Sequence, residues 1–190
     1  MISPSFAYKN KEVLSMKPSI PLWQMAGFVF TGILGTFLHF LFDLTGGNLI
    51  AGVFSAVNES IWEHMKLLFY PMVLFGLIEY WVWGKKISGF WRIKFRGILL
   101  GLILIPVIYY TYTGILGVSA DWFNITIFFL AAGASYRWET IRLQKPPVNT
   151  CIFLPVTALI GLGIVFTVLT FLPPHIPFFA DPITGNYGFS

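Results

Sequence analysis

Charged side chains are scarce in this sequence. Asp, Glu, Lys and Arg make up 11% of its 190 residues, whereas a typical soluble domain carries about 25%. Hydrophobic residues make up 56%, and the mean hydropathy is +0.76. This composition excludes an ordinary soluble domain and predicts an integral membrane protein.

Cysteine is almost absent as well. The single Cys151 excludes an intrachain disulfide framework and a cysteine-rich metal site. The N-terminal run MISPSFAYKNKEVLSMK lacks the apolar stretch of a removable signal peptide, so we expect the first span to be retained as an anchor. Nucleic-acid-binding motifs are also missing, and we assign the net charge of +4 to loops that meet lipid headgroups.

Long apolar runs are what the sequence has instead. Five of them are long enough, or nearly so, to cross a hydrocarbon core, which takes about 17 to 25 residues. They lack the alternation typical of a transmembrane β-strand, and they cover residues 21–44, 67–83, 97–115, 121–136 and 151–172. The run GGNLIAGVFSAV is too short to cross and begins with a turn signal. We predict an all-α helical bundle with about five transmembrane helices and one short re-entrant or interfacial segment.

Basic residues predict the orientation of these spans. Lys and Arg are retained preferentially on the cytoplasmic side, and eleven of the 12 lie in the N-terminal segment, between spans two and three or between spans four and five. We expect a cytoplasmic segment at residues 1–19, one transmembrane domain at 20–172 and an extracytoplasmic tail at 173–190. Turn signals and aromatic residues predict that this tail folds over the outer face. The expected location is a multi-pass position in the plasma membrane.

Two pairs of polar residues predict a metal site at the outer end. His39 and Asp43 are four residues apart near the end of the first span, and Glu59 and Glu63 are four apart at the start of the second. Carboxylate and imidazole ligands of this kind converge from neighbouring helices in helical bundles and suit zinc, manganese or another divalent ion. The predicted ligands are His39, Asp43, Glu59, Glu63 and His64.

A wider polar pocket is predicted around the same helix start. Its proposed binding residues are Asn58, Glu59, Trp62, Glu63, His64, Lys66 and Asp121. The alternative is a structural role, in which Asn58 caps the helix, Lys66 pairs with the glutamates and Asp121 caps the fourth span. Glu79 is predicted to pair with a cytoplasmic base such as Arg137, and a proton or ion group is the alternative for this intramembrane acid.

Two motifs in the chain carry a family resemblance. They are NESIWEHMK, residues 58–66, and FFADPITGNYG near the C-terminus, which reduce to the patterns NESxWEHxK and DPxTGxYG. From about Ile20 onward the chain resembles a family of small, uncharacterised bacterial membrane proteins that is grouped as a domain of unknown function. The resemblance implies this architecture and a bacterial plasma membrane, and it supplies no activity or substrate.

The function expected from these features is binding or transport of an ion or a small polar solute. A metal-dependent intramembrane hydrolase is the first alternative, although no HExxH proteolytic signature is present. A structural partner of a membrane complex is the second. The expected partners are the lipid bilayer and the ion or solute, with no nucleic acid, and the sequence decides neither catalysis nor oligomeric state.

Overall fold

Helices account for nearly all regular structure in the protein. The computed structural model describes residues 19–146 and 151–189, and within them six α-helices and one 3-10 turn form, with a single isolated β-bridge between Ala180 and Tyr187. The elements are α2 (Ile20–Leu44), α3 (Leu49–Phe54), α4 (Ile61–Val82), η1 (Gly84–Lys86), α5 (Phe90–Leu116), α6 (Asp121–Leu143) and α7 (Phe153–Phe171). The predicted all-α class is confirmed.

Four of these helices are long and apolar enough to cross a membrane. They are α2, α4, α5 and α7. The fifth long helix, α6, has 23 residues and continues past the predicted end at residue 136. It is less apolar than the others because polar residues are spread along it, and it packs mainly against α5 and α2.

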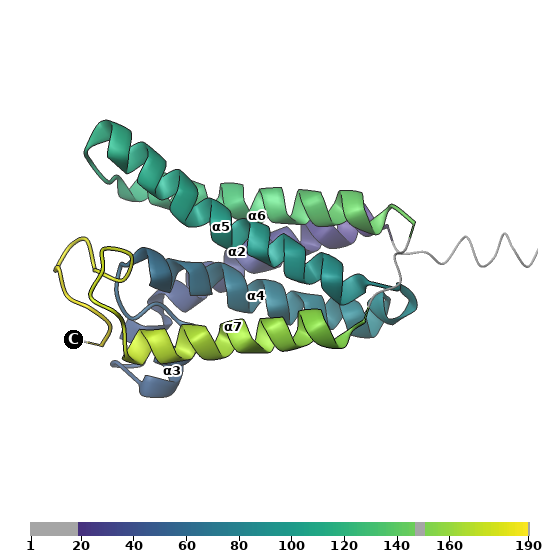
Figure 1. Ribbon diagram of the computed structural model, residues 1–190, viewed down its shortest axis with the longest axis horizontal. Coiled ribbons are helices and arrows are strands. Elements are labelled where there is room, and N and C mark those ends of the chain that lie inside the picture. Colours follow the sequence, from purple (N-terminus) through teal and green to yellow (C-terminus); the bar gives the residue numbers. More distant parts are fainter. Residues whose placement is uncertain (1–18, 147–150, 190) are drawn as a thin grey trace, which may run out of the picture.

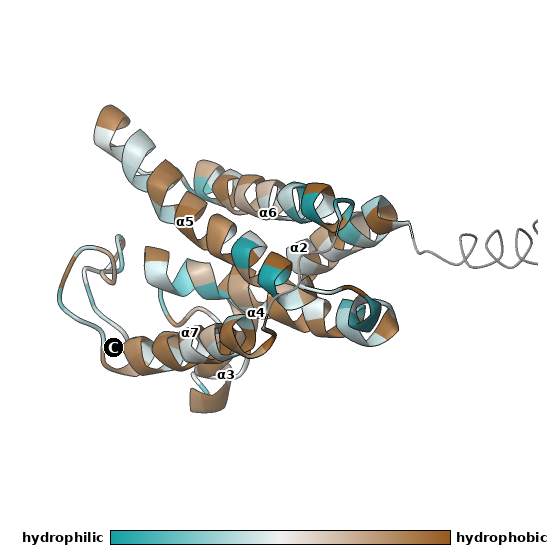
Figure 2. Cartoon of the chain, turned by 45° about the vertical axis from the view of Figure 1, so that its right-hand side comes forward, coloured by the Kyte–Doolittle hydropathy of each residue, from teal (hydrophilic) through white to brown (hydrophobic). Residues whose placement is uncertain are grey.

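The five long helices run side by side and alternate in direction (Figure 1). One end of the bundle, which we call the η1 end, holds η1, the start of α5 and the end of α6. The opposite end, which we call the tail end, holds α3 and the C-terminal tail, residues 173–189. Apolar residues extend along the helices, and hydrophilic residues gather at the start of α5 and the end of α6 (Figure 2).

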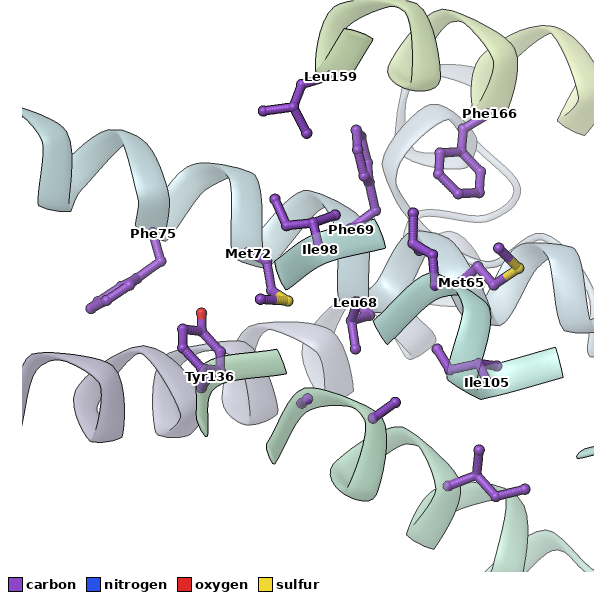
Figure 3. Close-up of a cluster of buried hydrophobic side chains, with 14 of the residues drawn as sticks. Met65, Leu68, Phe69, Met72, Phe75, Ile98, Ile105, Tyr136, Leu159 and Phe166 are labelled. Carbon is purple, nitrogen blue, oxygen red and sulfur yellow. The ribbon is translucent and has the colours of Figure 1, made fainter. Parts of the chain in front are cut away.

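A layer of large apolar side chains holds α4 against α5, α6 and α7 (Figure 3). Leu68 and Met72 of α4 and Ile98 of α5 are fully buried at its centre. In contrast, α2 and α7 expose large apolar side chains such as Ile33 and Leu154. Such exposed surface suits contact with lipid, because lipid tails solvate it as well as a protein interior does.

At the tail end, short polar contacts order the connections. Asn48 caps α3, since its Oδ1 accepts hydrogen bonds from the N–H groups of Ile50 (2.8 Å) and Ala51 (3.3 Å). The tail folds against the start of α4, where the backbone N–H of Trp62 donates to the carbonyl of Phe178 at 3.3 Å. Phe179 of the tail is buried. The tail therefore packs on the start of α4.

Candidate functional site

Three of the five predicted metal ligands meet at the tail end. His39 Nε2 lies 3.9 Å from Glu59 Oε1, and His64 Nε2 lies 3.4 Å from Glu59 Oε2. One ligand atom from each of the three residues lies within 4.8 Å of the other two. Their side chains are about one third exposed, at 30%, 41% and 29% for His39, Glu59 and His64. This group, the His39–Glu59–His64 triad, is accessible to a small ligand.

Local hydrogen bonds fix Glu59 just before the start of α4. Ser60 caps the helix, because its Oγ accepts from Glu63 N–H at 3.3 Å. Asn58 Oδ1 accepts from Ser60 N–H at 2.9 Å and so holds the preceding turn. Glu59 lies between these two bonds, in the loop rather than on the helix, and this position lets its carboxylate reach both histidines.

The backbone also orients the His64 ring. Its Nδ1 lies 2.9 Å from the carbonyl oxygen of Ser60. Because a carbonyl can only accept, Nδ1 carries a proton, and the neutral ring presents the lone pair of Nε2 to Glu59. When the ring is protonated, Nε2 donates to Glu59, and this hydrogen bond lowers the pKa of the Glu59 carboxyl below its ordinary value. Nε2 of His64 and the Glu59 carboxylate therefore face each other across 3.4 Å.

The other two predicted ligands, Asp43 and Glu63, lie outside this triad. Asp43 is exposed near the end of α2. Glu63 is 2% exposed and turns into the bundle, where its Oε2 lies 2.6 Å from Lys66 Nζ. The reason is that α4 begins at Ile61, so Glu59 and Glu63 do not share the helical face that their spacing predicts.

Glu63 and Lys66 belong to a buried network that joins three helices, which we call the Glu63 network. Lys66 Nζ also donates to the carbonyl of Gly52 at 2.8 Å and to Thr170 Oγ1 at 2.9 Å. Thr170 Oγ1 donates to Glu63 Oε1 at 2.8 Å, and Val57 N–H donates to Oε2 at 3.1 Å. All three donors of the ammonium are used, so the network connects α3, α4 and α7 without an unpaired charge.

The remaining predicted binding residues have separate positions. Ser60, rather than the predicted Asn58, caps α4, and Asn58 Nδ2 instead donates to the carbonyl of Gly188 at 3.1 Å. Trp62 is buried against Phe166 and the tail aromatics. Asp121 is exposed and is the first residue of α6, so Ala120 occupies the cap position predicted for it.

A family model described as a family of unknown function, DUF6512, matches residues 13–189. The chain belongs to this family. No curated protein and no solved structure matches the chain. Family membership agrees with the expected domain of unknown function, and the matched residues include both the triad and the Glu63 network.

The same matched region contains a second buried network near the η1 end, which we call the Glu79 network. Lys94 Nζ donates to Glu79 Oε2 at 2.7 Å and to Glu139 Oε2. Gln24 Nε2 donates to Glu79 Oε1 at 2.5 Å. The predicted pairing of Glu79 with a base is confirmed, but the base is Lys94 of α5 rather than Arg137, which is exposed.

Glu139 was not predicted as a site residue, although the sequence contains a signal for it. Ile127, Ala131, Ser135 and Glu139 recur every four residues along α6, and all four are buried. This spacing places them on one face of a helix. Because the first three are apolar or small, the stripe marks the buried face, and Glu139 continues it into the interior.

Proposed function

We propose that this protein binds a divalent transition-metal ion at the His39–Glu59–His64 triad. The observation that carries the proposal is the convergence of two imidazoles and one carboxylate, from α2, the loop before α4 and α4 itself, within 4.8 Å. Imidazole and carboxylate together are a ligand set for zinc, iron or manganese.

The spacing of the three groups fits such an ion. Nitrogen and oxygen ligands bind zinc at about 2.0 to 2.2 Å, which puts neighbouring ligands about 3.4 Å apart in a tetrahedron. The His64–Glu59 separation is 3.4 Å and the His39–Glu59 separation is 3.9 Å. His39 Nδ1 is buried and has no hydrogen-bond partner among the described residues.

The number of protein ligands favours a second candidate function, a metal-dependent hydrolase. Three protein ligands and an open fourth position are typical of catalytic zinc sites, where the open position takes a water molecule. The partial exposure of all three side chains leaves that position accessible. Transport of the ion and a structural role in a membrane complex are the other hypotheses. Neither of them requires an open fourth coordination position.

Metal analysis of the purified protein tests the proposal. We expect about one equivalent of zinc, manganese or iron per chain, and an increase in thermal stability when that metal is added to metal-free protein. His64→Asn and Glu59→Gln should each abolish both effects. His175→Asn is the matched control, because the His175 ring packs against Tyr187 in the tail, outside the triad.

Two results would contradict metal binding. One is wild-type protein that neither retains nor responds to these metals, and the other is a His64→Asn variant that binds as well as wild type. Hydrolysis of added ester or amide substrates that depends on the bound metal would support the enzyme over simple binding. Stabilisation by an organic solute without metal would support a solute-binding protein instead.

We further propose a bacterial plasma membrane as the location, with the η1 end in the cytoplasm and the tail outside. Support comes from Lys85, Lys86, Arg92 and Arg142, which belong to elements at the η1 end, since basic residues favour the cytoplasmic side. A reporter fused after the tail should be active outside, and one inserted between α4 and α5 should be active inside. The reverse pattern would overturn this orientation.

A further inference from the structure

The charges of the Glu79 network do not balance. Two carboxylates, Glu79 and Glu139, surround the single ammonium of Lys94, and all three side chains are 0% exposed. Gln24, the fourth member, is neutral. Among the described residues, no second cationic side chain forms an ion pair with either carboxylate. With both acids ionised, the network would hold one uncompensated negative charge, which is costly in a buried site.

Two acceptor atoms in the same network also have no partner. Glu139 Oε1 and Gln24 Oε1 are buried and accept no hydrogen bond within the described structure. Buried polar atoms are normally paired, because leaving one unpaired costs about 1 to 3 kcal/mol. The excess charge and the unpaired carboxylate oxygen both indicate that a positively charged species belongs here.

We propose that the Glu79 network is a proton-binding site, in which one proton is shared between the carboxyl groups of Glu79 and Glu139. A proton fits better than a metal ion, because Lys94 Nζ already occupies the position between the two carboxylates. Space is also lacking at the unpaired oxygen, since a Cβ atom built on Gly97 would lie only 2.3 Å from Glu139 Oε1. Binding forms one O–H bond and makes the network neutral.

The location of the proton decides which helix Lys94 is bound to. When Glu139 carries it, the ammonium pairs with the ionised Glu79 of α4, and when Glu79 carries it, the ammonium pairs with Glu139 of α6. The other groups that face the network are Gln24 of α2, which donates to Glu79, and Tyr136 of α6, whose ring centre lies 5.2 Å from Lys94 Nζ. The Tyr136 hydroxyl forms a hydrogen bond with Thr31 Oγ1 at 2.8 Å. Gln24 and Tyr136 carry no positive charge, so neither of them balances the second carboxylate.

Infrared spectroscopy of the protein in lipid nanodiscs tests this proposal, with glutamate labelled at the side-chain carboxyl carbon. At neutral pH we expect the C=O band of one protonated, buried glutamic acid in the wild type. Glu79→Gln and Glu139→Gln should each lose the band, because one remaining carboxylate then balances one ammonium. Glu12→Gln is the matched control and should keep it, since Glu12 belongs to the N-terminal segment that precedes α2.

Wild-type protein without a protonated glutamate band at neutral pH would overturn the proposal, whatever the folding of the variants. A band that survives in both Glu79→Gln and Glu139→Gln would also overturn it, because the proton would then lie elsewhere. These measurements use none of the triad residues, so they are independent of the proposed metal site.

Discussion

The Glu63 network and the Glu79 network place an ammonium group inside the same bundle and differ in how its charge is compensated. In the Glu63 network, one carboxylate faces one ammonium, and backbone groups and Thr170 complete the hydrogen bonds. In the Glu79 network, two carboxylates face one ammonium, and two acceptor oxygens have no partner among the residues that the structure describes. A balanced and saturated ion pair can only hold helices together, whereas an unbalanced one can take up a ligand.

Replacing one carboxylate in each network gives the largest expected contrast. Glu63→Gln leaves the buried Lys66 without a counterion, and we expect it to lower the free energy of unfolding by about 3 to 5 kcal/mol. Glu139→Gln leaves Lys94 paired with Glu79, and its amide has the shape of a protonated carboxyl, so we expect a loss below about 1 kcal/mol. Chemical unfolding in mild detergent measures both.

Equal losses in these two variants would break the distinction between the networks. A larger loss for Glu139→Gln would mean that both carboxylates are ionised and both are needed to hold Lys94.

A smaller effect is expected when the space beside Glu139 is filled. In Gly97→Ala the new methyl group would lie 2.3 Å from Glu139 Oε1, so the carboxyl group must move and its contact with Lys94 weakens. We expect a loss of about 1 to 3 kcal/mol, as for other overpacked interiors. Gly161→Ala is the control, because a Cβ atom there meets no atom of the described residues within 4 Å, and an equal loss at both sites would contradict the close contact.

The smallest effect is expected at the exposed triad, which gives a reference for the two buried networks. The hydrogen bond from His64 lowers the pKa of Glu59 below 4.5. A lowered carboxyl pKa stabilises the folded protein above the unfolded pKa, and this stabilisation disappears as the pH falls through the folded value. Wild type should therefore lose stability relative to Glu59→Gln below about pH 4.5, by at most about 0.5 kcal/mol because Glu59 is 41% exposed. A growing advantage of wild type in acid would contradict this sign.

The sequence predicts the fold more completely than it predicts the contacts of single residues. Long apolar runs define the helices, because length and composition alone decide whether a segment can cross a bilayer. The short apolar run after Gly47 contains the six-residue helix α3. Helix α6 was the weakest prediction, since its polar residues interrupt the apolar run that the length rule depends on.

The candidate site could be predicted only in part, because its geometry depends on where α4 begins. A helix that started at Asn58 would place Glu59 and Glu63 on one face, but Ser60 caps it two residues later, and the two acids turn in different directions. The preference of basic residues for the cytoplasmic side places Lys94 in the connection between the second and third spans. That rule cannot detect a buried ammonium, and Lys94 is one, with Glu79 and Glu139 as its partners.

The contact between Asn58 and Gly188 has a consequence for the order in which the protein is made. Asn58 Nδ2 donates to a carbonyl that is 130 residues further along the chain, and this bond helps to hold the turn before Glu59. A ribosome must therefore add those residues before the turn acquires its last partner. Helix pairs formed early in synthesis can already be packed by then. The triad should therefore be the last part of this molecule to reach its final geometry.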